Sequence, residues 1–299
     1  MAAESEIPVL DGPWRMVATA PEVGALATPK QQAVDFAIWQ AADGTWQIWS
    51  CIRNTLAGGE GGKTRLFHRW EGRTLEDNSW RACGVAMEAD PALGERPGGL
   101  QAPYVFRRDG IYHMFYGGWD EIARATSPDG KAFTRVIRDG RSGLFREPGD
   151  DANTRDPMII EIDGVFYCYY VASPGDKGAI YVRTSRDLDN WSESKIVCVG
   201  GTPGDGPWSA ECPFVVRRGD DFFLLRTQKY GRNALTHVYR SKDPMDFGVN
   251  DDRCLVASLP VAAPEVIEHD GGYVLAALGL ELEGIRLAPL TWRLGGANP

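Results

Sequence analysis

A short pattern that recurs four times constrains the fold of this chain more than any other feature. In each copy a proline precedes an apolar run, a turn of aspartate and glycine, and a second run rich in aromatic residues. Asp-Gly between two such runs is a strong β-hairpin signal. The repeats begin at Pro103, Pro157, Pro213 and Pro264, which gives spacings of 54, 56 and 51 residues (157−103, 213−157, 264−213). A repeat of this length made of short strands predicts a propeller blade.

A fifth unit precedes these four and lacks the proline. Two apolar runs, 34–39 and 46–52, are joined there by Asp43-Gly44. No 12-residue window shows helical periodicity. We therefore predict an all-β, five-bladed β-propeller forming a single domain over residues 1–299. The predicted blades span roughly residues 31–82, 101–140, 155–200, 209–258 and 262–293.

The first 30 residues carry little periodicity and read as an approach segment. A propeller must join its two ends, because an open ring would leave long sheet edges exposed. We therefore expect a strand near residues 14–18 to complete the last blade.

Blades two to four each end in a second repeated signature, Ser-x-Asp followed three residues later by an aromatic residue. Ser and Asp side chains bind nearby backbone amides in turns, and the aromatic residue would anchor the next strand. We expect a structural role for all three copies. They are Ser127/Asp129/Phe133, Ser185/Asp187/Trp191 and Ser241/Asp243/Phe247.

Composition limits the partners of the chain. The net charge is −9 and no basic block is present, so we expect no nucleic-acid partner. No apolar run approaches the roughly 20 residues of a membrane helix. Residues 1–6 lack the basic and apolar regions of a signal peptide, which indicates a cytoplasmic protein, although a trimmed secreted form would look the same.

Cysteine and histidine spacing indicates no metal and no cofactor. The six cysteines form no CxxC pair, and no His, Asp or Glu spacing specifies a transition metal. Several cysteines lie within apolar strand patterns, where a reduced cysteine acts as a small buried hydrophobe.

Carboxylates gather at the predicted starts of the innermost strands, which meet at one face of a propeller. Like charges in a cleft raise one another's pKa values and cost stability, whereas glycoside hydrolysis requires two carboxyl groups flanking one bond. The alternative is a set of satisfied carboxylates in a non-catalytic propeller. The strand starts are, in order, Asp35, Gln101 or Ala102, Asp156, Glu211 and Glu265.

Two short motifs resemble those of known enzymes. Arg155-Asp156-Pro157 resembles the Arg-Asp-Pro motif of glycoside hydrolase families 32 and 68, and Glu211-Cys212-Pro213 resembles the Glu-Cys motif of family 32. These families, with family 43, are five-bladed propellers. The chain departs from family 32 around its first catalytic aspartate, where residues 33–37 read AVDFA. A relationship to family 43 is therefore equally compatible.

The resemblance implies roles for four residues. Asp35 would be the nucleophile of a retaining enzyme or the general base of an inverting one. Asp156 would hold substrate hydroxyls and stabilise the transition state, and Glu211 would be the general acid/base. Arg155 would help orient the sugar.

Further candidates for substrate binding come from residue type. Tryptophans stack on sugars, and Trp208, three residues before Glu211, is the strongest candidate, with Trp39 as another. Gln101 starts an innermost strand. Glu265 follows its proline, so its side chain faces either the channel or the other side of the strand.

We therefore expect a glycoside hydrolase that cleaves O-glycosyl bonds of a small or oligomeric carbohydrate, with a fructoside or arabinoside as a candidate furanoside. One alternative is a glycoside phosphorylase, whose phosphate pocket would use Arg155, Arg226 and Lys229. The other is a carbohydrate-binding propeller without catalysis.

The expected chemistry sets two properties of the acid pair. Burial and neighbouring carboxylates should raise the pKa of Glu211, while Asp35 should stay ionised. The separation of their carboxyl groups distinguishes retention, at about 5–5.5 Å, from inversion, at about 6.5–9.5 Å. The two motifs favour retention.

Overall fold

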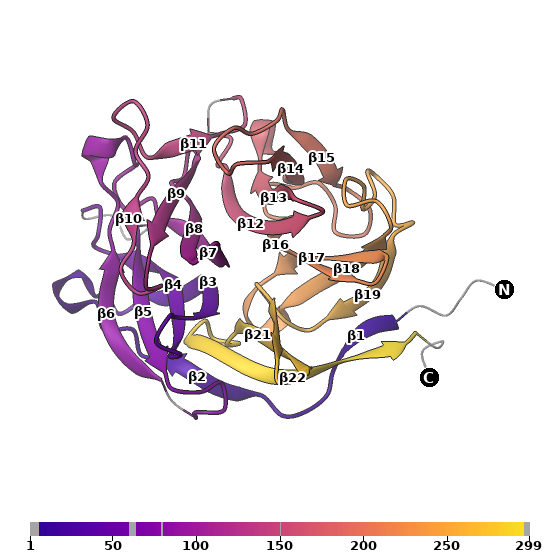
Figure 1. Cartoon of the computed structure of the whole chain (residues 1–299), viewed down its shortest axis with the longest axis horizontal. Coiled ribbons are helices and arrows are strands. Elements are labelled where there is room, and N and C mark those ends of the chain that lie inside the picture. Colours follow the sequence, from indigo (N-terminus) through magenta and orange to yellow (C-terminus); the bar gives the residue numbers. More distant parts are fainter. Residues whose placement is uncertain (1–5, 60–63, 79, 150, 296–299) are drawn as a thin grey trace.

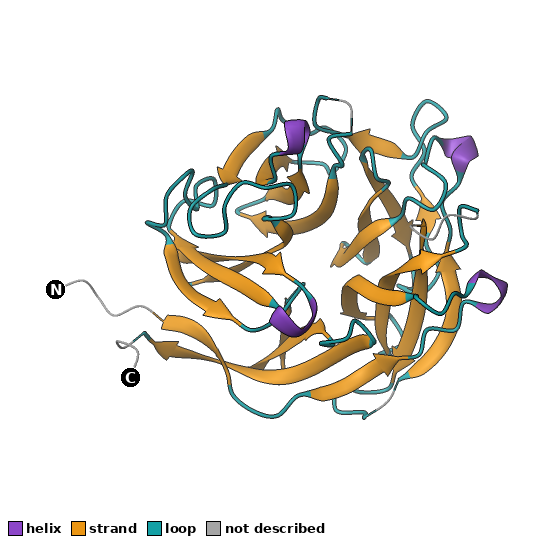
Figure 2. Ribbon diagram, turned by 180° about the vertical axis from the view of Figure 1, so that it is seen from behind, coloured by secondary structure: helices purple, strands orange, loops and turns teal. Residues whose placement is uncertain are grey.

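Five antiparallel sheets form a ring around a central channel in the computed structural model, which describes residues 6–59, 64–78, 80–149 and 151–295 (Figure 1). This confirms the predicted single-domain five-bladed propeller. Figure 2 shows that strands and loops make up the ring, with only short helical turns. No helix in these ranges is long and apolar enough to cross a membrane. Residues 1–5, on which the signal-peptide argument depends, lie outside them.

The strands follow the blades in chain order. Blade one contains β3 (Gln32–Gln40), β4 (Trp46–Thr55), β5 (Thr64–Gly72) and β6 (Arg81–Met87). Blade two contains β7 (Gln101–Arg108), β8 (Ile111–Gly117) and β9 (Ile122–Ser127), with β10 (Thr134–Arg135) and β11 (Gly143–Phe145) both paired to β9. Blade three contains β12 (Arg155–Ile162), β13 (Val165–Ala172), β14 (Ala179–Ser185) and β15 (Lys195–Cys198). Blade four contains β16 (Glu211–Arg218), β17 (Asp221–Lys229), β18 (Leu235–Ser241) and β19 (Leu255–Leu259).

Blade five combines the two ends of the chain. It contains β20 (Glu265–His269), β21 (Gly272–Leu278) and β22 (Gly284–Leu294), together with β1 (Glu6–Leu10) and β2 (Arg15–Thr19). Four three-residue 3-10 turns connect strands elsewhere: η1 (Gly24–Leu26), η2 (Pro91–Leu93), η3 (Pro174–Asp176) and η4 (Gly231–Asn233).

The Asp-Gly turns of blades two, three and five have the conformation that their sequence predicts, whereas in the blade-one turn only Gly44 has positive φ. Asp109 and Gly110 both have positive φ, 49° and 82°, and Arg108 pairs directly with Ile111 across the turn. Asp163 and Gly164 repeat this with 51° and 77°. Positive φ at both central residues is the type I′ hairpin, whose twist matches the twist of the flanking strands.

The Ser-x-Asp signature is structural, as predicted. Ser127 Oγ accepts the backbone N–H of Gly130 at 2.8 Å, and Ser185 Oγ accepts that of Leu188 at 2.9 Å. In the third copy Ser241 Oγ accepts the N–H of Asp243 at 3.0 Å, and Phe247 is fully buried. The serine thus caps the turn and the aromatic residue anchors it in the core.

Strand β22 closes the ring by pairing with both N-terminal strands. Its first half pairs with β2, with Thr19 opposite Gly284, and its second half pairs with β1, with Glu6 opposite Leu294. Strand β1 and the second half of β22 therefore lie side by side at the outer edge of blade five (Figure 1). This pairing covers an edge that would otherwise offer unpaired backbone groups.

Each blade also places one residue of its innermost segment in the left-handed region. In blades one to four the pairing of the innermost strand shifts register beside this residue, which marks a β-bulge. A bulge redirects the side chains next to it. The five residues, with φ from 36° to 55°, are Asp35, Ala102, Asp156, Cys212 and Ala263.

Gly284→Ala should destabilise the closed ring. A Cβ at position 284 would lie 1.8 Å from the carbonyl oxygen of Ala18 on β2, so backbone would have to move and the β2–β22 pairing would suffer. Overpacking of this kind costs about 1–3 kcal/mol. We expect a lower midpoint of urea unfolding, followed by tryptophan fluorescence.

Gly272→Ala on β21 of the same blade is the matched control, because its Cβ would find no atom closer than 3.7 Å. Its midpoint should stay near that of the parent protein. Equal midpoints for the two variants would mean that the β2–β22 contact does not limit stability.

Candidate active site

A cavity of about 210 Å³ opens at the start of the innermost strands and contains five of the eight predicted site residues. These are Asp35, Gln101, Arg155, Trp208 and Glu211. A second, narrower space in the channel has a volume of about 30 Å³, and its lining includes Asp35, Asp156 and Glu265. Asp35 therefore belongs to both spaces, at the point where they meet.

The blade repeat aligns these residues differently from the sequence prediction. Asp35 and Asp156 occupy the left-handed position, and the blade-four residue at that position is Cys212, not Glu211. Glu211 lies one residue earlier, in register with Arg155 and Gln101. Glu265 comes two residues after the left-handed Ala263. The site is thus built from two consecutive positions of the repeat.

Glu211 is a buried carboxylic acid next to the buried guanidinium group of Arg155. Its Oε1 lies 2.5 Å from Arg155 Nη2, and its Oε2 accepts from Arg155 Nε at 3.3 Å. Burial raises the pKa of Glu211 to about 8, helped by the charges of Asp156 and Asp35, while Arg155 opposes the rise. Desolvation outweighs the ion pair, so the carboxyl group holds its proton near neutral pH.

Asp35 accepts two hydrogen bonds on one oxygen. Tyr230 Oη donates to Asp35 Oδ1 at 3.0 Å, and Cys212 Sγ lies 3.1 Å from the same oxygen. Burial and the charge of Asp156 raise the pKa of Asp35, while the two hydrogen bonds lower it. Burial thus moves the pKa of Asp35 above its usual range, and the hydrogen bonds from Tyr230 and Cys212 favour the ionised form expected from the sequence.

Asp156 lies close enough to the other two carboxyl groups to act on both. Its Oδ2 accepts the backbone N–H of Cys212 at 3.0 Å, and Oδ1 is buried with no hydrogen-bond partner among the described residues. Asp156 borders the narrow channel and not the wide cavity. From there its charge raises the pKa of both Asp35 and Glu211.

Trp208 forms an exposed wall of the cavity. It is 62% exposed, unusual for a tryptophan, and the guanidinium carbon of Arg155 lies 5.2 Å from its ring centroid. An aromatic face held in this way can stack on the apolar face of a sugar ring. Gln101 contributes a buried Oε1 that no described residue binds.

Two predicted substrate-binding residues lie elsewhere. Trp39 is buried, donates its indole N–H to the carbonyl of Gly130 at 2.9 Å and packs edge-on against Phe133. It belongs to the contact between blades one and two, so its expected stacking role is wrong. Glu265 faces the narrow channel, where Oε2 accepts the N–H of Ile38 at 3.1 Å and burial raises its pKa well above the usual range.

Several site residues had no sequence signal. Tyr230 follows β17, and Gln228 and the arginines Arg53 and Arg65 lie on second and third strands of their blades. Cys212 is the one unpredicted site residue that belongs to a sequence motif, Glu211-Cys212-Pro213, but its thiol was interpreted from the sequence as a small buried hydrophobe.

The thiol of Cys212 is part of the carboxylate cluster. Its Sγ and oxygens of Asp35 and Asp156 lie within 4.8 Å of one another, close enough to share a metal ion. Burial raises the pKa of the thiol well above its usual value, which keeps it protonated and makes it a poor ligand. The expected absence of a metal stays a prediction.

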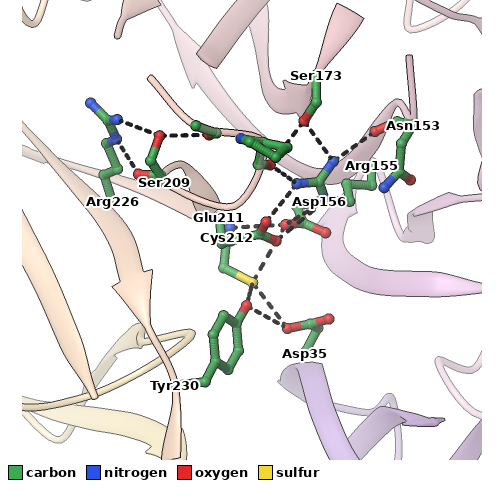
Figure 3. A network of polar contacts seen from close by, with 12 residues as sticks. Asp35, Asn153, Arg155, Asp156, Ser173, Ser209, Glu211, Cys212, Arg226 and Tyr230 are labelled. Atoms are coloured by element: carbon green, nitrogen blue, oxygen red, sulfur yellow. Dashed lines mark hydrogen bonds and ion pairs between the residues drawn. The ribbon is translucent and has the colours of Figure 1, made fainter. Parts of the chain in front are cut away.

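A buried arginine supports the loop that carries Trp208 (Figure 3). Arg226 on β17 is fully buried and donates to the carbonyls of Ser209 at 3.0 Å, Gly200 at 3.2 Å and Gly204 at 2.7 Å. Among the described residues it makes no ion pair. Arg226 therefore ties three points of the loop 200–209 to the sheet through backbone carbonyls.

Arg226→Lys should loosen this loop without unfolding the blade. One ammonium group cannot reach three carbonyls in different directions, so at least one loses its partner. Backbone amides of residues 203–209 should exchange with deuterium on the order of tenfold faster, measured by mass spectrometry.

Arg240→Lys on the neighbouring strand β18 is the control, since Arg240 pairs with Asp221 near the surface and does not touch the loop. It should leave exchange at 203–209 unchanged. Unaltered hydrogen–deuterium exchange in Arg226→Lys would show that the loop keeps its conformation without the contacts of Arg226.

No protein-family model and no curated protein match the sequence, but solved structures share its fold. A thermostable family-43 glycoside hydrolase superposes with a TM-score of 0.64 at 17% identity, covering 94% of both chains. An endo-arabinase from Bacteroides thetaiotaomicron gives 0.67 at 14% identity, covering 93% of this chain and 99% of that one. A family-32 β-fructofuranosidase from Bombyx mori gives 0.60 at 16% identity, covering 94% and 62%. At these identities the likeness shows the fold, the five-bladed propeller that the two motifs suggested.

Proposed function

We propose that this chain is a glycoside hydrolase that cleaves O-glycosyl bonds of a small or oligomeric carbohydrate. One observation carries the proposal: Asp35 and Glu211 line the same cavity, and Glu211 keeps its proton near neutral pH. One protonated and one ionised carboxyl group around one bond is the requirement for glycoside hydrolysis. The solved enzymes of the same fold support it, and arabinosides and fructosides are the first substrates to test.

The residues divide the reaction between them. Glu211 donates its proton to the glycosidic oxygen as the bond to the anomeric carbon breaks, which neutralises the leaving group. Asp35 acts on the opposite side of the sugar, as nucleophile if configuration is retained or as base for water if it is inverted. Asp156, close to both, disfavours a second negative charge and so keeps the proton on Glu211.

The rate of hydrolysis should show a bell-shaped dependence on pH. The rate rises as Asp35 loses its proton and falls as Glu211 loses its proton, toward pH 8. Because the pKa of Asp35 is raised, the acidic limb should lie above the value of about 4 of an ordinary aspartate. The limbs report the coupled group of carboxylates and not single residues.

The alternatives are weaker on this geometry. A phosphate pocket of Arg155, Arg226 and Lys229 does not form, since Arg226 is fully buried against carbonyls and, of these three residues, Arg155 alone lines the cavity. A carbohydrate-binding propeller without catalysis would have no use for a buried acid with a raised pKa, because burying it costs stability.

Glu211→Gln should lower kcat/KM on natural glycosides by roughly 10²–10⁴, the usual contribution of general acid catalysis. It preserves shape but removes the proton, so the basic limb of the pH profile should disappear. Aryl glycosides with good leaving groups need less protonation and should lose less in the bond-breaking step. Steady-state assays from pH 4 to 10 measure both effects.

Glu268→Gln, an exposed glutamate on β20, is the control and should keep the parent profile. Binding of a sugar by the parent protein with no turnover on any substrate of a broad panel would instead assign it to the non-catalytic class. An unchanged basic limb in Glu211→Gln would remove Glu211 from the role of acid.

Tyr230→Phe should move the acidic limb to higher pH. Its hydroxyl donates to Asp35 Oδ1 and thereby favours the ionised form, so its loss raises the pKa of Asp35 further. One such hydrogen bond corresponds to a shift of up to about one pH unit. Tyr167→Phe, on β13 in blade three, is the control, and a shift of the basic limb alone would contradict the assignment.

A further inference from the structure

Two arginines lie side by side on the cavity wall of blade one. Arg53 on β4 and Arg65 on β5 fall between the paired residues Ile52–Leu66 and Thr55–Thr64, and both line the 210 Å³ cavity. Like charges on neighbouring strands destabilise a sheet. A purely structural role for these two strands would not require the loss of stability that comes from placing two positive charges next to each other.

Arg53 is not neutralised by the protein around it. Its Nε donates to the neutral Oε1 of Gln32 at 2.9 Å, and it makes no ion pair with any residue in the described ranges. The wall therefore carries a positive charge that faces the cavity.

Arg65 is held in place and acts on the reacting end of the cavity. Its guanidinium carbon lies 4.7 Å from the centroid of the Trp119 ring, a geometry that orients the planar cation. Its charge lowers the pKa of Asp35. Arg65 therefore lies close enough to Asp35 to influence its charge, and the pair comes from blade one, whereas Arg155 and Glu211 come from blades three and four.

We propose that Arg53 and Arg65 form a subsite for an anionic group carried by the sugar itself, a carboxylate as in a uronic acid or a sulfate or phosphate ester. Planar guanidinium groups bind such oxyanions through paired, charge-assisted hydrogen bonds. The inference rests on the proposed function and narrows its substrate class to acidic glycosides.

Free phosphate as a co-substrate fits the site less well. It would have to approach the anomeric carbon from the side that Asp35 occupies, and a phosphate dianion beside a carboxylate is repelled. An anionic substituent on the sugar ring need not approach the anomeric carbon.

The test compares matched aryl glycosides, glucuronide against glucoside and galacturonide against galactoside, with 6-sulfated and 6-phosphorylated sugars as further arms. For the parent protein, kcat/KM should favour at least one anionic member, and the preference should weaken as salt rises from 0.05 to about 0.5 M. Arg53→Gln and Arg65→Gln should each lower the ratio of anionic to neutral kcat/KM by about tenfold or more. Arg186→Gln, an exposed arginine on blade three, should leave the ratio and the activity unchanged.

Calorimetry separates this inference from the proposed function. Uronic acids should bind Glu211→Gln more tightly than the matching neutral sugars, and the added Arg53→Gln change should remove the difference. Binding of this kind without hydrolysis by the parent protein would end the proposed function and keep the subsite. Hydrolysis of neutral glycosides with no anionic preference, or a preference that the arginine variants leave intact, would overturn the subsite, as would phosphate-dependent release of a sugar phosphate.

Discussion

The left-handed residue of each blade is the constraint on which the site depends. Successive side chains of a regular strand point to opposite faces, so Arg155 and Asp156 could not both reach the centre of the ring. The bulge at Asp156 breaks this alternation, and the same holds for Glu211 and Cys212. A left-handed non-glycine residue costs roughly 1–2 kcal/mol. Because five blades share the conformation, the packing of the whole ring supports it.

The balance between Arg155 and Glu211 follows from that arrangement. Both side chains are buried, and the attraction between them competes with the loss of water around the carboxylate. Arg155 also donates to the carbonyls of Asn153 at 2.9 Å and Pro207 at 3.2 Å, so its charge is shared among several acceptors. Burial of the carboxyl group outweighs the attraction of Arg155, so Glu211 keeps its proton next to an arginine.

Local signals in the sequence were enough to predict the five blades, but they predicted only part of the site. Prolines and Asp-Gly turns act within a few residues, so their spacing revealed the repeat, and the motifs around Asp156 and Glu211 located two carboxylates. Glu265 faces the channel, one of the two orientations that its place after Pro264 left open, but it lies two residues beyond the left-handed Ala263 and in the narrow part. The prediction that Trp39 stacks on the sugar was wrong because residue type alone does not say which neighbouring blade a side chain packs against.

The remaining site residues come from strands that carry no motif. Arg53 and Arg65 reach the cavity from second and third strands, Tyr230 reaches it from the segment just after β17, and their position depends on the tilt of a whole blade. Such positions follow from the assembled ring and not from any stretch of sequence. The raised pKa of Asp35 has the same origin, since burial is a property of the packed molecule.

Closure of the ring by β1 and β2 has a consequence for how the molecule is made. Glu6 pairs with Leu294, so the contact joins residues 288 positions apart (294−6). A chain that leaves the ribosome N-terminus first carries two strands with no partner until almost all of it has been synthesised. Contacts of such long range form slowly, and unpaired strands invite association with other chains. We therefore expect β1 and β2 to be the strands most prone to mispairing until β22 has been synthesised.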